Sequence, residues 1–460
     1  MHMHLCASVV NMPHDIGAGN ILPPYRSVMN IDNKTTNGPA GRREIFSWAM
    51  YDFANSGYTT VVLTTIFSAY FVAVIANGLP AGTGTFLWTL AIGIANFTVL
   101  LSAPVAGAVA DHRAMKKRFL LATTIGCVAG TALLSLAGSG DILFAMLLLI
   151  LSAVCFSLGE SLIAAFLPEI APAGKMGRIS GYGWSLGYLG GLLTLGICLA
   201  WITWAKDKGL QATEYVPVTL LITAAIFALS ATPTFAWLRE RAVARPLADD
   251  ASYLKSAFSQ VARTLREAAR YQDLFRFLLS LTVFQAGVAT VVVLAAVYAQ
   301  EVMGFDSQQL VVLIMVVNVT AAAGAFIFGY AQDRFGSVPS LAVALLIWIA
   351  AVLVIFVAES NAGVWFAGNL IGAAMGATQA GGRALIGELT PVARSGEFFG
   401  LWGMANRVAA IIGPVSYGII SWLSDGNHRM AILSTLTFFV IGLLLLLRVN
   451  ESRGKEAGRY

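Results

Sequence analysis

The chain has 460 residues, of which 57% are hydrophobic and only 12% are charged, with a formal net charge of +5. Water-soluble globular proteins carry about 25% charged residues. The composition therefore excludes a water-soluble domain, because too few polar side chains remain to cover its surface, and it predicts a protein embedded in the lipid bilayer.

The N-terminal tail, residues 1–43, precedes the first long apolar run. It is rich in Asn, Pro and Gly and lacks the apolar core of a secretory signal peptide, so we expect it to be disordered. The chain's four cysteines show neither a pairing pattern nor a metal-binding spacing. We therefore expect no disulfide framework and no structural metal.

Twelve apolar runs follow, and each reaches or approaches the roughly 20 residues that a helix needs to cross a bilayer. They predict an all-α membrane protein with twelve transmembrane helices. The runs are Ile45–Ala76, Thr85–Ala110, Arg118–Leu136, Ile142–Pro168, Ile179–Trp201, Val216–Trp237, Leu274–Ala299, Ser307–Tyr330, Pro339–Ala358, Val364–Leu389, Glu397–Leu423 and Met430–Leu447.

The segment between the sixth and seventh runs, residues 239–273, has its own pattern. Apolar residues recur at helical spacing from Leu254 to Ala269, with Arg263, Arg266 and Arg270 around them. This pattern is typical of an amphipathic helix on a membrane surface. We interpret it as a tether that also meets anionic lipid, in preference to a regulatory element.

The two halves of the chain repeat each other. The pattern E-x-x-P-x-x-[KR]-x-G-x-x-x-G begins at Glu169 and again at Glu388, and a G-x-x-x-D motif ends at Asp111 and again at Asp333. Parallel six-helix repeats of this kind are a transporter architecture, with the substrate site between the halves. We therefore expect two pseudo-symmetric six-helix bundles, residues 44–238 and 274–448, and a short C-terminal tail, 449–460.

Basic residues lie mainly on one side of the predicted membrane. Of the 29 Lys and Arg residues, 24 fall in the tails and in the loops on the side of the termini, three fall on the other side and two lie inside spans. This asymmetry places both termini in the cytoplasm of a plasma (inner) membrane protein. It also accounts for the positive charge without nucleic acid as a partner.

The first span contains a carboxylate, Asp52, in the stretch WAMYDFANSGY. A charge at the centre of a membrane helix costs roughly 2.5–3.5 kcal/mol on insertion scales, so Asp52 must face protein or a water-filled cavity. Asp52, Asn55, Ser56 and Thr59 share one helical face. We interpret this face as a contact for substrate or ion, the alternative being a hydrogen bond to a neighbouring helix.

Other polar residues within the spans suit a central site. Glu160 lies in the middle of the fourth span, and Gln379 is its counterpart in the repeat. Glu160 is our candidate for binding a proton or a cation, unless it is a structural carboxylate. Arg383 could pair with Glu160 or Asp52, or bind a substrate carboxylate, and Arg407 has the same alternatives.

The loop after the second span, Gly107–Arg118, resembles the loop signature of the major facilitator superfamily, and Gly329–Gly336 resembles it more closely. The first copy has His112 and Ala114 where a basic residue and a glycine are common, so the sequence leaves open whether the same tight turn forms. The resemblance implies that the loop aspartates face the starts of spans 11 and 5 and latch the cytoplasmic gate. The gating residues that it implies are Asp111, Arg113, Asp333 and Arg334.

Three longer stretches resemble the "unknown major facilitator" family, which is related to the autophagy-related vacuolar amino-acid effluxers. They are WAMYDFANSGY, LPEIAPAGKMGRISGYGWSLGYLGG and GGRALIGELTPVARSGEFFGLW, and the resemblance extends over residues 44–448. That family usually has a carboxylate before a glycine in span 7. This chain has Ala286 before Gly287, so any proton coupling must use another acid.

We expect a secondary transporter that moves a small polar metabolite, by kinship an amino acid, by alternating access. The nucleotide-binding motif GxxxxGK[ST] is absent, and all five histidines lie in tails or loops. The sequence thus supports neither an ATP-driven pump nor an intramembrane metalloenzyme, and we expect no cofactor. A receptor or scaffold on a transporter fold remains the alternative. The expected partners are a small-molecule substrate, lipid and, if transport is coupled, protons.

Overall fold

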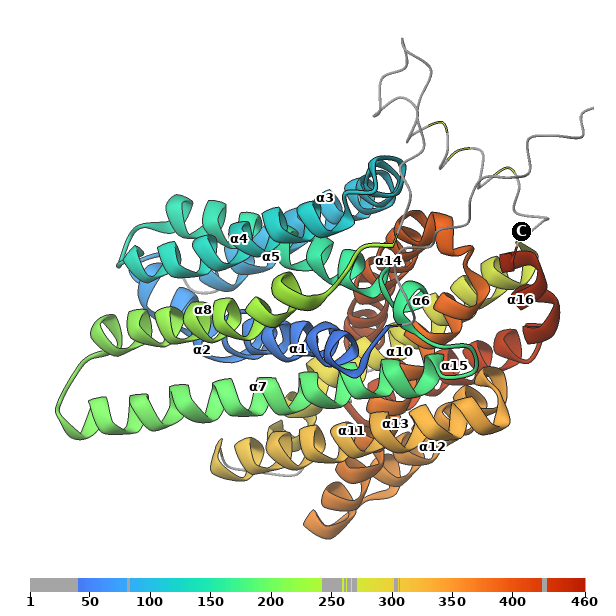
Figure 1. The fold of residues 1–460 in the computed structure, drawn as a ribbon. Helices are drawn as coiled ribbons and strands as arrows, with labels where there is room; N and C mark the ends of the chain where they lie inside the picture. The colour runs from blue at the N-terminus through green and yellow to red at the C-terminus, as the bar shows by residue number, and fades with distance from the viewer. Residues whose placement is uncertain are drawn as a thin grey trace, which may run out of the picture. The chain divides into compact units, whose positions relative to one another are not determined.

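The computed structural model describes residues 40–80, 83–241, 271–301, 305, 307–423 and 428–459, with the isolated residues 259, 262 and 266. Within this described part of the chain the regular elements are all helices (Figure 1). They belong to one compact unit, Pro39–Tyr460. The predicted N-terminal tail and amphipathic connecting helix lie almost wholly outside the described residues, and the predicted domain boundaries stay predictions.

The first half of the chain supplies six long helices. The first is built from α1, two π-helical segments and α2, and a short helix, α6, follows the fourth. The elements are α1 (Arg42–Tyr58), the π-helices Thr59–Thr65 and Phe71–Ile75 that flank α2 (Ile66–Tyr70), α3 (Thr83–Arg113), α4 (Lys116–Leu133), α5 (Ile142–Ala164), α6 (Leu167–Ile170), α7 (Met176–Asp207) and α8 (Ala212–Trp237).

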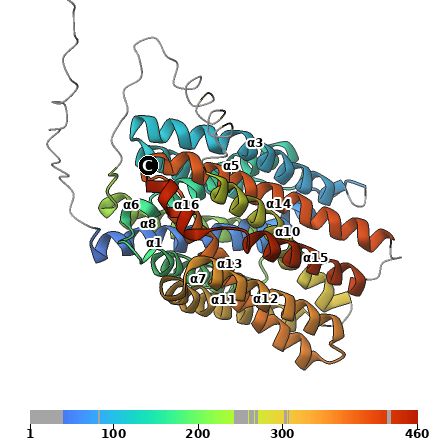
Figure 2. The same ribbon diagram turned by 90° about the vertical axis from the view of Figure 1, so that its right-hand side faces the viewer.

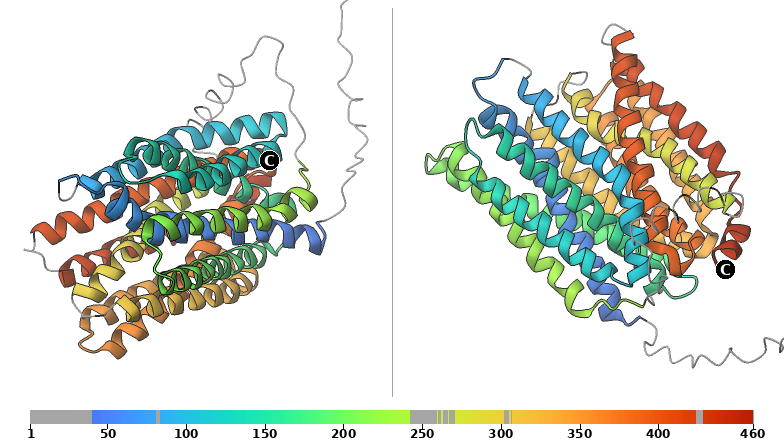
Figure 3. Two further views of the ribbon diagram at one scale, coloured as in Figure 1. Left: turned by 90° about the vertical axis from the view of Figure 1, so that its left-hand side faces the viewer. Right: turned by 90° about the horizontal axis from the view of Figure 1, so that it is seen from above.

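The second half supplies six more long helices and one short one. They are α10 (Gln272–Glu301), α11 (Ser307–Phe335), α12 (Ser337–Val357), α13 (Asn361–Leu389), α14 (Ser395–Leu423), α15 (His428–Leu446) and α16 (Glu451–Arg459). The first half, coloured blue to green, and the second half, coloured yellow to red, form two adjacent groups of helices (Figure 3). The predicted architecture of two six-helix bundles is confirmed.

Each of the twelve predicted spans coincides with one long helix. Among the described residues, ten helices are long and apolar enough to cross a membrane by themselves, and α15 qualifies together with α16 across a 68° bend. The remaining helix is α13, which is rich in glycine and contains Gln379 and Arg383. It tolerates this composition because neighbouring helices cover it, and residues 380–387 are all buried.

The first membrane helix is less regular than its sequence suggests. The polar face that starts at Asp52 leaves the α-helix at Tyr58, and Thr59–Thr65 continue as a π-helix. The hydroxyl of Thr65 donates to the carbonyl of Thr60 at 2.5 Å, and Thr64 donates to the same carbonyl. Threonine hydroxyls that bond to preceding carbonyls compete with the regular ladder, which explains the change of helix type in this threonine-rich stretch.

The most extensive contacts between the two halves are those of α7 with α11 and of α3 with α14. Glycines allow the backbones to approach closely. A Cβ atom added at Gly181 would lie 2.6 Å from the carbonyl oxygen of Ala325, and one added at Gly400 would lie 2.6 Å from the Cα of Pro104. Alanine at either position would push the halves apart.

Each half also has its own apolar core. Trp48 and Tyr58 are fully buried in the first, and Trp348 stacks on Phe439 in the second with the ring centroids 5.0 Å apart. Ala165, at the end of α5 in the first half, is fully buried and belongs to the core of the second half. The two cores therefore join at this position.

The short helix α16 turns back across the end of the second half (Figure 2). It packs on α13 and α10. We call the side of the helix bundle that carries Arg42 and α16 the terminal side.

A residue with a positive φ follows both α3 and α11. Ala114, after α3, has a φ of 50°, and Gly336, after α11, has a φ of 98°. The left-handed conformation costs a residue with a Cβ roughly 1–2 kcal/mol, and glycine avoids this cost. The two turns differ in length, because α12 begins directly after Gly336 whereas Met115 separates Ala114 from α4. The first copy therefore does not form the same turn as the second, and it turns with backbone strain at Ala114.

Candidate functional site

A buried ion pair joins the two halves. Arg383 of α13 places Nη1 2.6 Å from Oδ2 of Asp52 in α1, and its side chain is only 3% exposed. Its Nη2 donates to the Ser180 carbonyl oxygen at 3.0 Å, and its Nε donates to the Ser180 hydroxyl at 3.2 Å. The guanidinium also lies over two indole rings, at 4.6 Å from the centroid of Trp48 and 5.4 Å from that of Trp184.

All of these partners of Arg383 belong to the first half, although Arg383 itself comes from the second. Opposite charge, two hydrogen bonds and two cation–π contacts hold one side chain, so it is a firmly fixed connection. The sequence offered Asp52 or Glu160 as the partner of Arg383, and the structure pairs it with Asp52.

A second ion pair across the interface is held less tightly. Arg407 of α14 donates from Nη2 to Oε2 of Glu160 in α5 at 3.2 Å, and its Nη1 donates to Oδ1 of Asn96 in α3 at 3.4 Å. The side chains of Arg407 and Glu160 are 19% and 28% exposed. The pair therefore has longer contacts and more access to solvent than the pair of Asp52 and Arg383.

Amide side chains border the two ion pairs. Gln379 does not contact Glu160, its counterpart in the repeat, but accepts a hydrogen bond from Gln285 of α10 at 3.0 Å. Several buried polar atoms among the described residues have no partner within the protein, although such atoms are normally paired. They include Oδ1 of Asn55, Oε1 of Gln285, Nε1 of Trp184 and Nε of Arg407. These four atoms lie on four different helices, α1, α10, α7 and α14.

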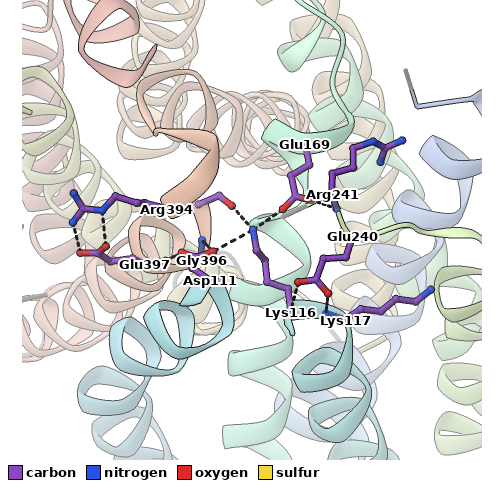
Figure 4. A network of polar contacts seen from close by, with 10 residues as sticks. Asp111, Lys116, Lys117, Glu169, Glu240, Arg241, Arg394, Gly396 and Glu397 are labelled. Atoms are coloured by element: carbon purple, nitrogen blue, oxygen red, sulfur yellow. Dashed lines mark hydrogen bonds and ion pairs between the residues drawn. The ribbon is translucent and has the colours of Figure 1, made fainter. Parts of the chain in front are cut away.

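On the terminal side, Asp111 closes the interface between α3 and α14. Its carboxylate accepts the backbone N–H groups of Gly396 at 3.0 Å and Glu397 at 2.9 Å, in the first turn of α14 (Figure 4). The partial positive charge of a helix N-terminus stabilises a carboxylate at this position.

The cation beside Asp111 is Lys116, whose side chain is completely buried. Its Nζ lies 3.2 Å from Oδ1 of Asp111 and 2.5 Å from Oε1 of Glu169, and it donates to the Ser395 hydroxyl at 2.7 Å. Figure 4 shows this ammonium group between Glu169 on one side and Asp111 on the other. One lysine of the first half thus bonds to the first residue of α14 in the second.

Asp333 makes the equivalent contact between α11 and α7. It accepts the backbone N–H of Gly177 at 2.9 Å and that of Arg178 at 3.3 Å, at the start of α7. The side chain of Arg178 lies 3.4 Å from Oδ2 of Asp333 and is 33% exposed, and it covers the ring of Tyr330. The two loop aspartates therefore bind the two helix N-termini to which the resemblance assigned them.

The gating roles of Arg113 and Arg334 stay predictions. Both side chains are exposed, and the guanidinium of Arg334 lies over the Phe335 ring, 5.5 Å from its centroid. Lys116 and Arg178 are cations in direct contact with the two aspartates. The sequence alone did not indicate Lys116 as a site residue, because this lysine is one of four basic residues in the same loop. The glutamate that the repeat places at both Glu169 and Glu388 was the signal that could have indicated a cationic partner nearby.

The polar contacts between the halves run from the terminal side to the middle of the helices. Asp111 and Asp333 lie near the ends of α3 and α11 on the terminal side. Asn96, which contacts Arg407, lies near the middle of α3. The structure is therefore closed on the terminal side.

Comparisons with known proteins identify the relatives of this chain. Residues 171–459 match the family described as vacuole effluxer Atg22 like. The chain is 28% identical over 416 residues to an uncharacterized MFS-type transporter, YxiO, of Bacillus subtilis, an alignment covering 90% of this chain and 96% of that protein. It is 22% identical to autophagy-related protein 22 of Eremothecium gossypii, covering 94% and 96%. Other fungal relatives match over about half of their own length.

The fold has solved counterparts. The proton:xylose symporter XylE superposes with a TM-score of 0.68 at 15% identity, covering 90% of this chain and 96% of that one. Such low identity supports the shared fold alone. The family match takes in more than half of the chain, so this protein belongs to the Atg22-like family of major facilitator transporters.

Proposed function

We propose that this transporter moves a small zwitterionic metabolite of amino-acid type, and that the Glu160–Arg407 pair is its binding site. The observation that carries the proposal is the loose contact of 3.2 Å between these two partly exposed side chains, one from each half. A ligand carboxylate suits the guanidinium of Arg407, and a ligand ammonium suits the carboxylate of Glu160. A ligand that replaces the contact bridges both halves.

Unpartnered polar atoms on α1, α10 and α7 agree with a polar ligand. Oδ1 of Asn55 and Oε1 of Gln285 are acceptors, and Nε1 of Trp184, whose ring lies against Arg383, is a donor. The pair of Asp52 and Arg383 is a weaker candidate, because its guanidinium already has two hydrogen bonds and two aromatic neighbours. Kinship with vacuolar amino-acid effluxers agrees with an amino-acid substrate.

The terminal side is, in this proposal, the cytoplasmic side of a plasma membrane. The excess of basic residues on that side supports this orientation. The closed contacts of Asp111 and Asp333 would then belong to the outward-facing or occluded state of the alternating-access cycle. Protons are the proposed coupling ion, and Glu160 is the proposed carrier because its link to Arg407 can be exchanged for a proton.

The test is a thermal-shift screen of the purified protein with the twenty amino acids and other small metabolites, followed by counterflow of each stabilising compound in proteoliposomes. Arg407→Gln should raise the substrate concentration for half-maximal counterflow about tenfold or more, because a hydrogen bond to a charged group contributes about 1.5–3 kcal/mol. Arg448→Gln, at an exposed arginine that has no role in the proposed site or gate, is the control.

Two outcomes would overturn the proposal. If Arg407→Gln transports as well as the control, the ligand binds elsewhere. If compounds bind but none is transported by the unaltered protein, the receptor alternative replaces it.

A further inference from the structure

The chain segment that follows α8 folds back onto the terminal ends of the first half. The carboxylate of Glu240 accepts the backbone N–H of Lys116 at 2.7 Å and that of Lys117 at 3.2 Å, in the first turn of α4. The next residue, Arg241, forms two hydrogen bonds to Glu44 of α1, at 2.6 and 2.8 Å. Its backbone N–H donates to Glu169 at 2.9 Å. We call Glu240 and Arg241 the first clasp.

The segment that follows α15 makes two matching kinds of contact in the second half. Glu451 accepts the backbone N–H of Ser337 at 2.9 Å and that of Val338 at 3.1 Å, at the start of α12. Arg453 forms two hydrogen bonds to Asp273 of α10, at 2.6 and 2.8 Å. We call Glu451 and Arg453 the second clasp.

Each clasp performs two tasks within its own half. Its glutamate caps the N-terminus of the third span of that half, and its arginine pairs with an acid at the start of the first span. Carboxylates stabilise helix N-termini through the helix dipole and through the free N–H groups of the first turn. The pseudo-symmetry of the transporter therefore extends beyond the membrane helices.

The two clasps differ in the residue that they cap. In the first half this residue is Lys116, whose ammonium reaches Asp111 and, across the interface, Ser395. In the second half it is Ser337, whose hydroxyl donates to Glu388 in the same half at 2.6 Å. Only the first clasp holds the backbone of a residue that joins the two halves.

We propose that Glu240 is a positioning residue of the gate, which fixes the first turn of α4 so that Lys116 bonds to the second half. Lys116 is buried without exposure, and a buried ammonium is stable only with well-placed partners. Without the cap, the first turn of α4 loses the carboxylate that holds its free N–H groups, and the ammonium can withdraw toward water. Asp111 and Ser395 then lose their cation.

The surroundings of Glu240 agree with this positioning role. Burial raises the pKa of the Glu240 carboxyl, while the N–H groups of Lys117 and Lys116 oppose this rise. The hydrogen bond from Arg241 to Glu44 raises the pKa of Arg241, which keeps the neighbouring cation charged. The backbone N–H groups of α4 thus hold a partly desolvated carboxylate in place.

The test compares Glu240→Gln with Glu451→Gln, its counterpart in the second clasp. Ala165→Cys, in a background without the four native cysteines, reports opening of the terminal side because this residue is buried in the core shared by both halves. The readout is the rate at which a polar maleimide labels the detergent-purified protein. No substrate is needed, so failure of the proposed function leaves this test intact.

Glu240→Gln should raise the labelling rate two- to five-fold, the factor that corresponds to a charge–dipole interaction of about 0.3–1 kcal/mol. Glu451→Gln should lower the melting temperature but leave the labelling rate unchanged. Glu240→Asp, which keeps the charge, should restore most of the protection. In a Lys116→Met background, Glu240→Gln should add nothing further, because the two residues act on one contact.

Equal labelling of the two Gln variants would show that the clasps only stabilise their own halves. Additive effects of Glu240→Gln and Lys116→Met would show that Glu240 does not act through Lys116. If Glu240→Gln does not yield folded protein, Lys116→Met in the reporter background tests the contact on which the proposal depends, and an unchanged labelling rate in that variant contradicts the proposal.

Discussion

Arg383 and Asp52 lie on opposite halves of the protein, with Nη1 of the arginine 2.6 Å from Oδ2 of the aspartate. Both side chains are almost completely buried. In this setting the pair has a clear energetic role: each charge compensates the desolvation of the other, and neither is stable alone. The contact therefore fixes the relative position of α1 and α13 in the state that the structure represents.

The first prediction concerns this pair. Asp52→Ala should destabilise the protein by about 3–5 kcal/mol, because it leaves the guanidinium buried with no counter-charge. The double variant Asp52→Ala with Arg383→Met should lose much less than the sum of the two single variants, since no charge remains unpaired. Unfolding in detergent, followed by tryptophan fluorescence, measures this coupling. Strictly additive losses would mean that the two side chains do not depend on each other.

The second prediction concerns the loop aspartates. Asp333→Asn should raise maleimide labelling of the Ala165→Cys reporter about two- to five-fold, because it weakens a charge–dipole contact worth roughly 0.3–1 kcal/mol. Asp111→Asn should raise it more. Its cation, Lys116, is fully buried and loses a partner, whereas Arg178 beside Asp333 is 33% exposed and can turn to solvent.

Unchanged labelling in both Asn variants would show that the aspartates are not latches. The reverse order of the two effects would contradict the role assigned to the burial of Lys116.

The sequence predicted the twelve helices well because each apolar run ends in polar or basic residues, and this pattern depends on the bilayer rather than on packing. The resemblance of the two loops also predicted that Asp111 and Asp333 face helix N-termini, and both do. The choice of Asp52 over Glu160 as the partner of Arg383 could not be predicted. It depends on how the helices of the two halves are rotated toward each other, and no local pattern records that rotation.

Two other features could not be predicted from the sequence, for different reasons. The π-helix at Thr59–Thr65 arises from side-chain bonds to the backbone that no apolar periodicity reveals. The two clasps were missed because Glu240 and Glu451 are not separated by the spacing of the main repeat, which runs from Glu169 to Glu388. Their likeness lies in what they cap rather than in an aligned motif.

The third prediction concerns coupling. Glu160→Gln should abolish substrate accumulation driven by a pH gradient, because the amide cannot exchange its contact with Arg407 for a proton. Exchange of labelled for unlabelled substrate needs no net proton movement, so it should continue, but at a higher substrate concentration because the amide binds the ligand ammonium more weakly than the carboxylate does. Proteoliposome uptake with and without a pH gradient measures both, with Glu359→Gln at an exposed position as control. Gradient-driven accumulation that persists with unchanged pH dependence would make Glu160 structural and direct attention to Asp52.

The last prediction concerns the two tight turns. Ala114 has a φ of 50°, a conformation that costs an alanine roughly 1–2 kcal/mol, whereas Gly336, the residue that follows α11, has a φ of 98° without that cost. Ala114→Gly should therefore stabilise the protein by about 1 kcal/mol, after the greater flexibility of glycine in the unfolded chain is subtracted. Gly336→Ala should destabilise it by more, because the added Cβ would also lie 3.2 Å from Oε2 of Glu451 in the second clasp. Thermal unfolding of the two variants in one detergent measures both signs, and a stabilising Gly336→Ala or a destabilising Ala114→Gly would show that strain in these turns does not decide their stability.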